Sequence, residues 1–333
     1  MGYALSFLDK SPIDGDEPAS HALQRTLALA RKAEVLGFRR FWVAEHHNSP
    51  GLASSSPEVL IGFLLAHTKS IHIGSGGVML QHYSAYKVAE NFNLLSALAP
   101  GRVDLGVGKA PGGLPLSTRA LQGAYDPARK PSFDAQLAEL DGFLKHGGTE
   151  EIGADRLLAY PVPDVTPNRF LLGASTESAR LAAGLGWGFV YAGHIHGDDT
   201  AISSAFSAYR DAGGTYALLA VAVVVADTDQ AAESLKANDR RFRVEVENGQ
   251  GVNVGSQEQA AEYARQAGAT NYRIEERSPL VIRGGPARVR TELQRLHQRF
   301  GIDEFVIDCP VADAAHRLKA IEHLAPQGKA IAA

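Results

Sequence analysis

Three ionisable side chains stand together where an apolar segment of the sequence ends. Phe41 to Ala44 are apolar, and Glu45, His46 and His47 follow before the chain reaches Asn48-Ser49-Pro50. Because side chains alternate along a strand, Glu45 and His47 are expected on one face and His46 on the other. Imidazole and carboxylate groups can transfer protons near neutral pH, although a histidine pair is often structural or lies on the surface. Glu45 and His46 are therefore the candidate catalytic residues.

A glycine-rich segment further along the chain offers a second candidate site. Gly74, Gly76 and Gly77 lie inside the apolar segment IGSGGVML, where glycine would weaken a strand. Three glycines there indicate either a bulge or a surface that a flat ligand approaches closely. A glycine pair also tolerates unusual backbone geometry, including a cis peptide. Gly76 and Gly77 are therefore candidates for binding a cofactor.

Two other segments carry groups that could hold an anion. Lys109 lies in the glycine-rich segment GVGKAPGG, where it could bind a phosphate or simply be solvated. Ser175, Thr176 and Ser178 follow the apolar segment RFLLGA and begin a helical pattern. Such residues cap helix starts, but the free amides and hydroxyls of a helix start can also bind phosphate. Together with the glycines, these residues favour a cofactor that has an aromatic ring and a phosphate.

A metal site is the rival interpretation. His194 and His196 are separated by one residue, so their imidazoles can point the same way, as in barrel hydrolases that bind a divalent metal. Further ligands would come from His46, His82 and Asp198. Asp308 is the only clear acidic residue at the end of the last apolar segment, and a metal site leaves the glycines unexplained. The metal-dependent hydrolase is therefore kept as an alternative.

The order of apolar and amphipathic segments indicates how these residues are positioned. Short apolar runs alternate with helical patterns, which implies βαβ units and a parallel sheet. The predicted strands begin near residues 3, 39, 71, 102, 169, 187, 216 and 303. Eight strands, each followed by a helix, suit a (β/α)₈ TIM barrel better than an open doubly wound sheet, whose first βα turn usually carries phosphate-binding glycines. In such a barrel the carboxyl ends of the strands form the active-site mouth.

Two stretches depart from this alternation. Residues 148–168 are rich in proline and glycine and form an excursion before the fifth strand. Residues 228–285, between strands seven and eight, are too long for a single loop and contain helical patterns at 228–247 and 256–268. Insertions of this length commonly form a lid or a substrate wall. We therefore predict a single domain over residues 1–333, with an insertion or lid region at 228–285 inside it.

The composition is that of an ordinary globular protein. Of the 333 residues, 45% are hydrophobic and 21% are charged, and the formal net charge is −4. The sequence has no basic cluster with interleaved aromatic residues, so we expect a small-molecule substrate and no nucleic acid partner. It has no signal-peptide pattern and no run of residues suited to a membrane span, and a single cysteine, Cys309, cannot form an intrachain disulfide. These features predict a cytoplasmic protein without membrane contacts.

In combination, the sequence resembles the bacterial luciferase-like family of flavin-dependent oxidoreductases over nearly its whole length. The resemblance is carried by LSFLDKSP, AEHHNSPG, IGSGGVML, PGRVDLGVGKAPG and GASTESARLAAGLGWGF. It implies a (β/α)₈ barrel that binds FMN, with the flavin ring against the Gly76-Gly77 peptide, which is often cis in the family. It also implies that His46 faces the flavin, with Glu45 as its neighbour.

The resemblance also implies a phosphate site and an activity. The FMN phosphate would lie at Lys109, where relatives usually have arginine, and at Ser175 and Ser178. Reduced FMN from a partner NAD(P)H:flavin reductase would react with O₂, and a small organic substrate would be oxygenated. Gly108 stands where luciferase proper has cysteine, so light emission is not expected, and a homodimer is favoured. The alternatives are hydride transfer with a deazaflavin on the same fold, a metal-dependent hydrolase, and a flavin-binding protein without turnover.

Overall fold

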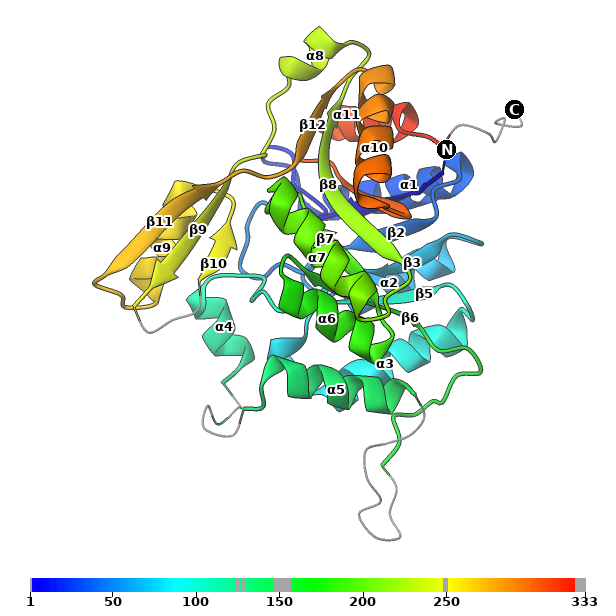
Figure 1. Ribbon diagram of the computed structural model, residues 1–333, viewed down its shortest axis with the longest axis vertical. Coiled ribbons are helices and arrows are strands. Elements are labelled where there is room, and N and C mark those ends of the chain that lie inside the picture. The colour runs from blue at the N-terminus through cyan, green and yellow to red at the C-terminus, as the bar shows by residue number, and fades with distance from the viewer. Residues whose placement is uncertain (1, 124–125, 127–129, 146–156, 248–250, 327–333) are drawn as a thin grey trace.

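The eight strands predicted from the sequence close into a parallel barrel in the computed structural model, which describes residues 2–123, 126, 130–145, 157–247 and 251–326 (Figure 1). Around the barrel each strand pairs with the next in parallel, and the pairing of β7 with β8 completes the ring. The strands in this order are β1 (Ala4–Asp9), β2 (Arg40–Val43), β3 (His72–Ser75), β5 (Val103–Gly108), β6 (Asn168–Gly173), β7 (Gly188–Ala192), β8 (Ala217–Val225) and β13 (Glu304–Asp308). The predicted fold class is therefore confirmed.

Helices cover the outside of the barrel, one after each strand (Figure 1). They are α1 (Ala19–Leu36), α2 (Pro57–Ala66), α3 (Ala85–Leu98), α5 (Phe133–Leu144), α6 (Thr176–Leu185), α7 (Asp199–Asp211), α10 (Pro286–Phe300) and α11 (Ala314–His323). Side chains of the strands fill the barrel on one face and pack under the helices on the other, and every residue of β8 is buried. This two-sided burial explains why the strands are continuous apolar runs. Among the described residues, no helix combines the length and apolar character needed to cross a bilayer.

Short elements at the carboxyl ends of the strands complete the mouth of the barrel. β4 (Val78–Met79) follows β3 and pairs with β5, and the 3₁₀ turn η1 (Leu80–His82) comes directly after it. α4 (Pro115–Leu121) lies between β5 and α5. Of the excursion predicted at 148–168, residues 148–156 lie outside the described residues, and 157–167 contain no helix or strand.

An insertion lies between the last two barrel strands, β8 and β13, as predicted, but one local prediction within it is wrong. The helical pattern at 228–247 gives only a short helix, α8 (Asp229–Glu233), and then a strand, β9 (Arg241–Val246). In β9, Phe242 and Val244 alternate with polar residues and pack in a small core of the insertion. A strand results because the apolar period is two residues rather than the helical 3.6.

The remaining part of the insertion folds around β9. The helix predicted at 256–268 is confirmed as α9 (Gln257–Gln266), and its Ala260 and Ala264 pack against β9. Two further strands, β10 (Val252–Val254) and β11 (Tyr272–Arg277), make a three-stranded antiparallel sheet with β9. The chain then returns to the barrel through β12 (Val281–Gly284), which pairs with β8.

The insertion sheet projects from the body of the barrel on the same side as α4 (Figure 1). Gln266 of α9 makes the connection, because its side-chain oxygen accepts a hydrogen bond from the Leu116 amide at 3.0 Å. Its backbone carbonyl accepts another from the Arg119 guanidinium at 3.0 Å. The insertion after β8 and helix α4 after β5 therefore meet, although β6 and β7 separate these two strands around the barrel.

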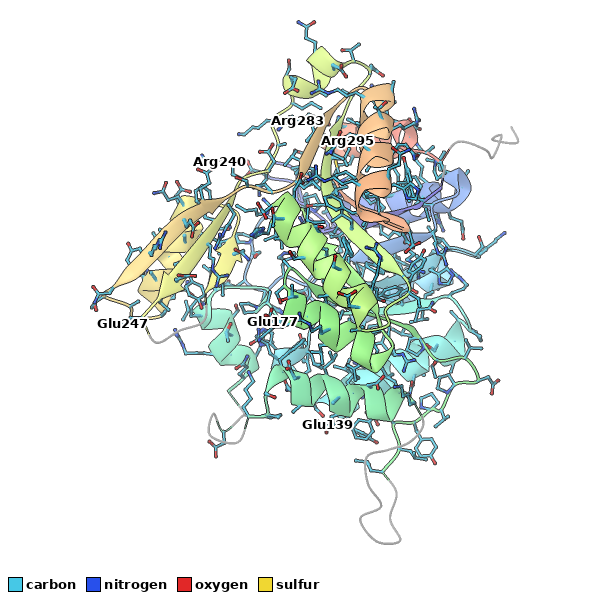
Figure 2. The ribbon with its side chains drawn as sticks, in the orientation of Figure 1. Glu139, Glu177, Arg240, Glu247, Arg283 and Arg295 are labelled. Carbon is cyan, nitrogen blue, oxygen red and sulfur yellow. The ribbon has the colours of Figure 1, made fainter. Side chains whose placement is uncertain are left out.

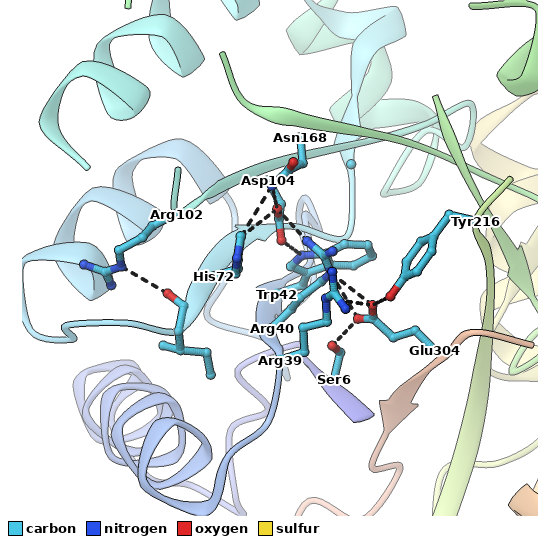
Figure 3. A network of polar contacts seen from close by, with 12 residues as sticks. Ser6, Arg39, Arg40, Trp42, His72, Arg102, Asp104, Asn168, Tyr216 and Glu304 are labelled. Carbon is cyan, nitrogen blue, oxygen red and sulfur yellow. Dashed lines mark hydrogen bonds and ion pairs between the residues drawn. The ribbon is translucent and has the colours of Figure 1, made fainter. Parts of the chain in front are cut away.

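A network of buried charges closes the opposite, amino-terminal end of the barrel (Figure 3). Arg40, the first residue of β2, lies 2.7 Å from Asp104 Oδ1 and 3.0 Å from Glu304 Oε1. The Trp42 indole donates to Asp104 at 2.9 Å, and the Tyr216 hydroxyl donates to Glu304 at 2.7 Å. Residues at this end of a TIM barrel usually contribute to stability. Because the network lies at the end of the barrel opposite the mouth, we assign its residues no part in the site.

Candidate active site

Glu45 holds together the segments at the end of β2 and after β3. Its carboxylate is fully buried, and Oε1 accepts a hydrogen bond from the Tyr83 hydroxyl at 2.7 Å. The Nε2 atom of His47 lies 2.7 Å from the same oxygen, so Glu45 and His47 share a face as predicted. Oε2 accepts from the backbone amide of Met79 at 2.9 Å. These three bonds are all within the protein, so Glu45 positions the backbone that follows the glycine pair.

The glycine pair directly follows β3 and packs between β2 and β5. The Gly76-Gly77 peptide is cis, which is the geometry that the resemblance implies. The Gly76 amide donates to the Val43 carbonyl at 2.9 Å, so the pair is attached to the strand that leads to His46. A Cβ on Gly76 would lie 2.7 Å from Leu8, and one on Gly77 would lie 2.8 Å from the Gly106 carbonyl oxygen. No other residue fits at either position without movement of its neighbours.

His46 points into a different set of side chains from Glu45. Its Nδ1 atom is buried and has no hydrogen-bond partner in the described part of the chain. Burial, followed by the positive charge of Lys10, lowers the pKa of His46 to about 4. The imidazole is therefore neutral at pH 7 and can accept or donate a proton at its free nitrogen.

Lys10, Asp308, Arg241 and His194 surround His46, and we call these five residues the mouth cluster. Lys10 Nζ lies 2.6 Å from Asp308 Oδ2, and Arg241 Nη2 lies 3.8 Å from the same oxygen. Burial lowers the pKa of His194 to about 3, and its Nδ1 is also buried without a partner within the described residues. Although burial opposes ionisation of Asp308, the charge of Lys10 holds its pKa below the usual value.

Two residues of the mouth cluster, Lys10 and Arg241, were not predicted from the sequence as site residues. Lys10 follows β1 directly and Asp308 ends β13, so both lie at the carboxyl end of a strand, which is a usable signal. Asp308 was considered only as a metal ligand. Arg241 belongs to the segment that was predicted as helix, and nothing in its local pattern indicates that it reaches the barrel.

The residues predicted to bind a phosphate lie at the ends of two neighbouring strands. Gly108 pairs with Leu172 across β5 and β6, so Lys109 and Ser175 follow adjacent strand ends. Ser175 caps α6 by accepting a hydrogen bond from the Ser178 amide at 3.2 Å, and the two serine hydroxyls are 3.3 Å apart. The Thr176 hydroxyl is 3.3 Å from the carboxylate of Glu177, an exposed residue of the first turn of α6 (Figure 2).

Lys109 does not contact these serines. It is exposed, and its Nζ lies 5.9 Å from the centre of the Phe133 ring at the start of α5. Its backbone carbonyl accepts a hydrogen bond from the Gln81 side chain at 2.8 Å. The exposed ammonium is free to reorient, since a cation–π contact at this distance is weak at an exposed site.

Of the histidines of the rival metal site, only His46 and His194 lie together. His82 is held by the Pro111 carbonyl at 2.7 Å and by the Gln122 side chain at 2.9 Å. His194 belongs to the mouth cluster, whereas His196 lies near Arg277 and Asp198. No group of three or more potential metal ligands occurs among the residues that the structure describes.

The parallel (β/α)₈ barrel is shared with known oxidoreductases, and the sequence identifies which of them. Residues 4–304 match the family described as Luciferase-like monooxygenase. The chain therefore belongs to the luciferase-like monooxygenase family.

Individual relatives cover almost the whole chain. It is 46% identical over 318 residues to the N-acetyl-S-alkylcysteine monooxygenase of Bacillus subtilis (strain 168), covering 94% of each chain. Among solved structures, apo-MsnO8 superposes with a TM-score of 0.76 at 28% identity and covers 97% of both chains. The oxygenating constituent of 3,6-diketocamphane monooxygenase from Pseudomonas putida, in complex with FMN, gives a TM-score of 0.68 at 17% identity, covering 97% of this chain and 96% of its own, and shows the shared fold.

Proposed function

We propose that this protein is an FMN-dependent monooxygenase that oxygenates a small thioether of the N-acetyl-S-alkylcysteine class. The class of substrate comes from the relative that shares 46% of its residues over 94% of this chain. The observation that carries the cofactor is the glycine pair beside a buried histidine with a free nitrogen. Bound reduced FMN would supply the electrons with which O₂ is activated.

The glycine pair fits a flat ring system. Because neither Gly76 nor Gly77 carries a Cβ, this backbone packs closely against Leu8 and Gly106, and an aromatic ring would lie against the plane of the peptide that it holds in place. Glu45 fixes this backbone through the Met79 amide. His46, at the end of the adjacent strand, offers an unpartnered Nδ1 from which a proton can be delivered or to which one can be returned.

The start of α6 fits a phosphate. Its first amides have no partners within the helix, and the hydroxyls of Ser175, Thr176 and Ser178 add further donors. Lys109, at the end of the neighbouring strand, would supply the positive charge that relatives provide with arginine, without the paired geometry of a guanidinium. A flavin phosphate there would replace the local interaction of Thr176 with the Glu177 carboxylate.

The insertion at 228–285 would form one wall of the substrate site. It contacts α4 through Gln266, and its Arg241 belongs to the mouth cluster. A wall of this kind excludes water from the mouth, which an oxygenation reaction requires.

We also propose that the protein is a homodimer that receives reduced FMN from a separate flavin reductase. Adjacent helices α2 and α3 expose large apolar side chains: Val59, Phe63, Leu94 and Leu98, of which Val59 and Leu98 are more than two thirds exposed. Contiguous exposed apolar residues on one face commonly mark an interface. Sedimentation of the wild type and of Leu98→Glu would test this, with Leu116→Glu on α4 as the matched control. A wild-type monomer would contradict the dimer.

The cofactor is tested by anaerobic titration with reduced FMN, followed by exposure to O₂ in the presence of N-acetyl-S-methylcysteine. We expect tight binding of reduced FMN and oxygen-dependent consumption of the thioether. His46→Ala should reduce turnover strongly and FMN affinity only weakly, whereas His21→Ala, at an exposed position of α1, should change neither. Binding of a reduced deazaflavin in place of reduced FMN would support hydride transfer instead, and binding of neither would contradict both.

A further inference from the structure

We propose that Lys10 and Arg241 form a subsite for the carboxylate of the substrate, at the part of the mouth that also contains His46 and His194. The inference rests on the proposed function, because it assigns the part of the substrate that this mouth recognises. It lies at the ends of β1 and β13, away from the start of α6, which follows β6.

The subsite is assembled from elements that are far apart in sequence. Leu8 of β1 pairs with Asp308 of β13, which places Lys10 beside the last residue of the neighbouring strand. Lys10 Nζ lies 2.6 Å from Asp308 Oδ2. Arg241 comes from the insertion and approaches the same oxygen at 3.8 Å. Two cations therefore converge on a single carboxylate oxygen.

The charges of this cluster do not balance. Within the described part of the chain, neither Lys10 nor Arg241 has an ion-pair partner other than Asp308. The nearby carboxylate of Asp9 is paired with Arg317 at 2.5 Å, so Asp9 does not neutralise the excess positive charge. Lys10 is largely buried and Arg241 is 8% exposed. A partly buried site with one excess positive charge favours an anion, because burial of unmatched charge is costly.

The geometry also leaves donors available. Arg241 Nη1 is held by the backbone carbonyls of Asn238 at 3.0 Å and Arg240 at 2.7 Å. Among the residues that the structure describes, its Nη2 approaches only Asp308, at 3.8 Å, which is longer than a hydrogen bond. The anchored guanidinium therefore presents its second nitrogen to the mouth, where the free Nδ1 atoms of His46 and His194 can complete the contacts.

The single excess positive charge of the cluster would be neutralised by the single negative charge of a substrate carboxylate. The substrate named for the Bacillus subtilis relative, an N-acetyl-S-alkylcysteine, carries a single carboxylate and no amine charge, because the nitrogen is acetylated. The carboxylate at this subsite would hold the substrate at one end and leave its sulfur toward the glycine pair.

The test is calorimetric titration of the purified full chain with N-acetyl-S-methylcysteine and with its primary amide, before and after addition of FMN. We expect the wild type to bind the acid at least about 10-fold more tightly than the amide. Arg241→Gln should bind both compounds equally weakly. Arg241→Lys should retain a preference for the acid, since it keeps the charge, and this variant shows whether a loss in Arg241→Gln reflects charge or folding.

Arg240→Gln is the matched control. Arg240 precedes Arg241 in the chain but is exposed at the base of the insertion, where it pairs with Glu276 at 2.8 Å (Figure 2). Its replacement should leave the preference for the acid unchanged. Equal binding of acid and amide by the wild type, no binding of either, or an unchanged preference in Arg241→Gln would each overturn the subsite. Because these titrations need no turnover, they are independent of the flavin and oxygen experiments that test the proposed function.

Discussion

The carboxylate of Glu45 accepts a hydrogen bond from the backbone amide of Met79 at 2.9 Å, and this bond joins the end of one barrel strand to the backbone that follows the glycine pair of the next. Tyr83 and His47 occupy the other oxygen. The residue predicted from the sequence as catalytic thus has the contacts of a positioning residue. His46, its neighbour in the chain, has a buried nitrogen in the mouth that no described residue contacts through a hydrogen bond.

Glu45→Gln should therefore damage the cofactor site without removing a proton donor. One of the carboxylate oxygens becomes an NH₂ group, which cannot accept from Met79, Tyr83 or His47. We expect the free energy of unfolding to fall by about 1–3 kcal/mol. The affinity for reduced FMN should fall as well, measured by anaerobic titration. Tyr83→Phe removes only one of the bonds and should have a smaller effect in the same direction. Unchanged FMN affinity in Glu45→Gln would contradict the positioning role.

Gly77→Ala should be destabilising and should weaken flavin binding. The added methyl group would lie 2.8 Å from the Gly106 carbonyl oxygen, and backbone atoms there cannot move aside without disturbing β5. Gly184→Ala on α6 is a suitable control, because its Cβ would meet no atom within 4 Å. Alanine also favours a helix over glycine by roughly 0.5–1 kcal/mol, so this variant should be slightly more stable. Urea unfolding and FMN titration of both variants measure the difference.

Ser175→Ala should separate helix capping from phosphate binding. Loss of an N-cap costs about 1 kcal/mol of stability. Ser256 caps α9 in the same way, accepting from the Gln259 amide at 3.1 Å, but lies in the insertion. Both alanine variants should lose a similar free energy of unfolding, whereas only Ser175→Ala should bind FMN more weakly. Equal FMN affinity in the two variants would place the phosphate elsewhere.

The buried histidines should make the stability depend on pH. In the unfolded chain the pKa of histidine is about 6.5, whereas in the folded protein the pKa of His46 is lowered to about 4 and that of His194 to about 3. Between these values the unfolded state binds more protons, so stability is full above pH 6.5 and falls as the pH is lowered toward 4.

The slope is at most about 1.4 kcal/mol per pH unit for each histidine. Around His46 the charged or titratable groups are Lys10, Asp308, His47, Arg241 and His194. His46→Asn should flatten the dependence between pH 5 and 6.5, measured as the free energy of urea unfolding, and His21→Asn should not. A wild type of constant stability over that range would show that the histidines are not buried in this way.

The barrel was largely predictable from sequence, because its strands are buried on both faces. Ala217–Val225 is buried at every position and contains only apolar residues, so it could be recognised without tertiary information. The local structure of residues 228–247 was not predictable in this way. A polar segment with an apolar residue at every second position can be mistaken for a surface helix.

The candidate site was predictable only where its residues are adjacent in the chain. Glu45, His46 and the glycine pair each follow a strand and could be selected by type and position. The contact of Lys10 with Asp308 spans 298 positions and exists only because β1 and β13 are neighbours in the closed barrel. Arg241 reaches the site through the fold of the insertion, which no local pattern reveals.

The origin of Arg241 has a consequence for how such a protein can diverge. The ends of β2, β3, β5 and β6 carry the residues suited to a flavin, whereas one of the two cations of the mouth cluster comes from a segment outside the barrel repeat. Exchange of residues 228–285 would thus alter which molecules are selected while the redox machinery stays intact. Under the proposed function, one part of substrate recognition would thus be encoded outside the barrel repeat that carries the electron chemistry.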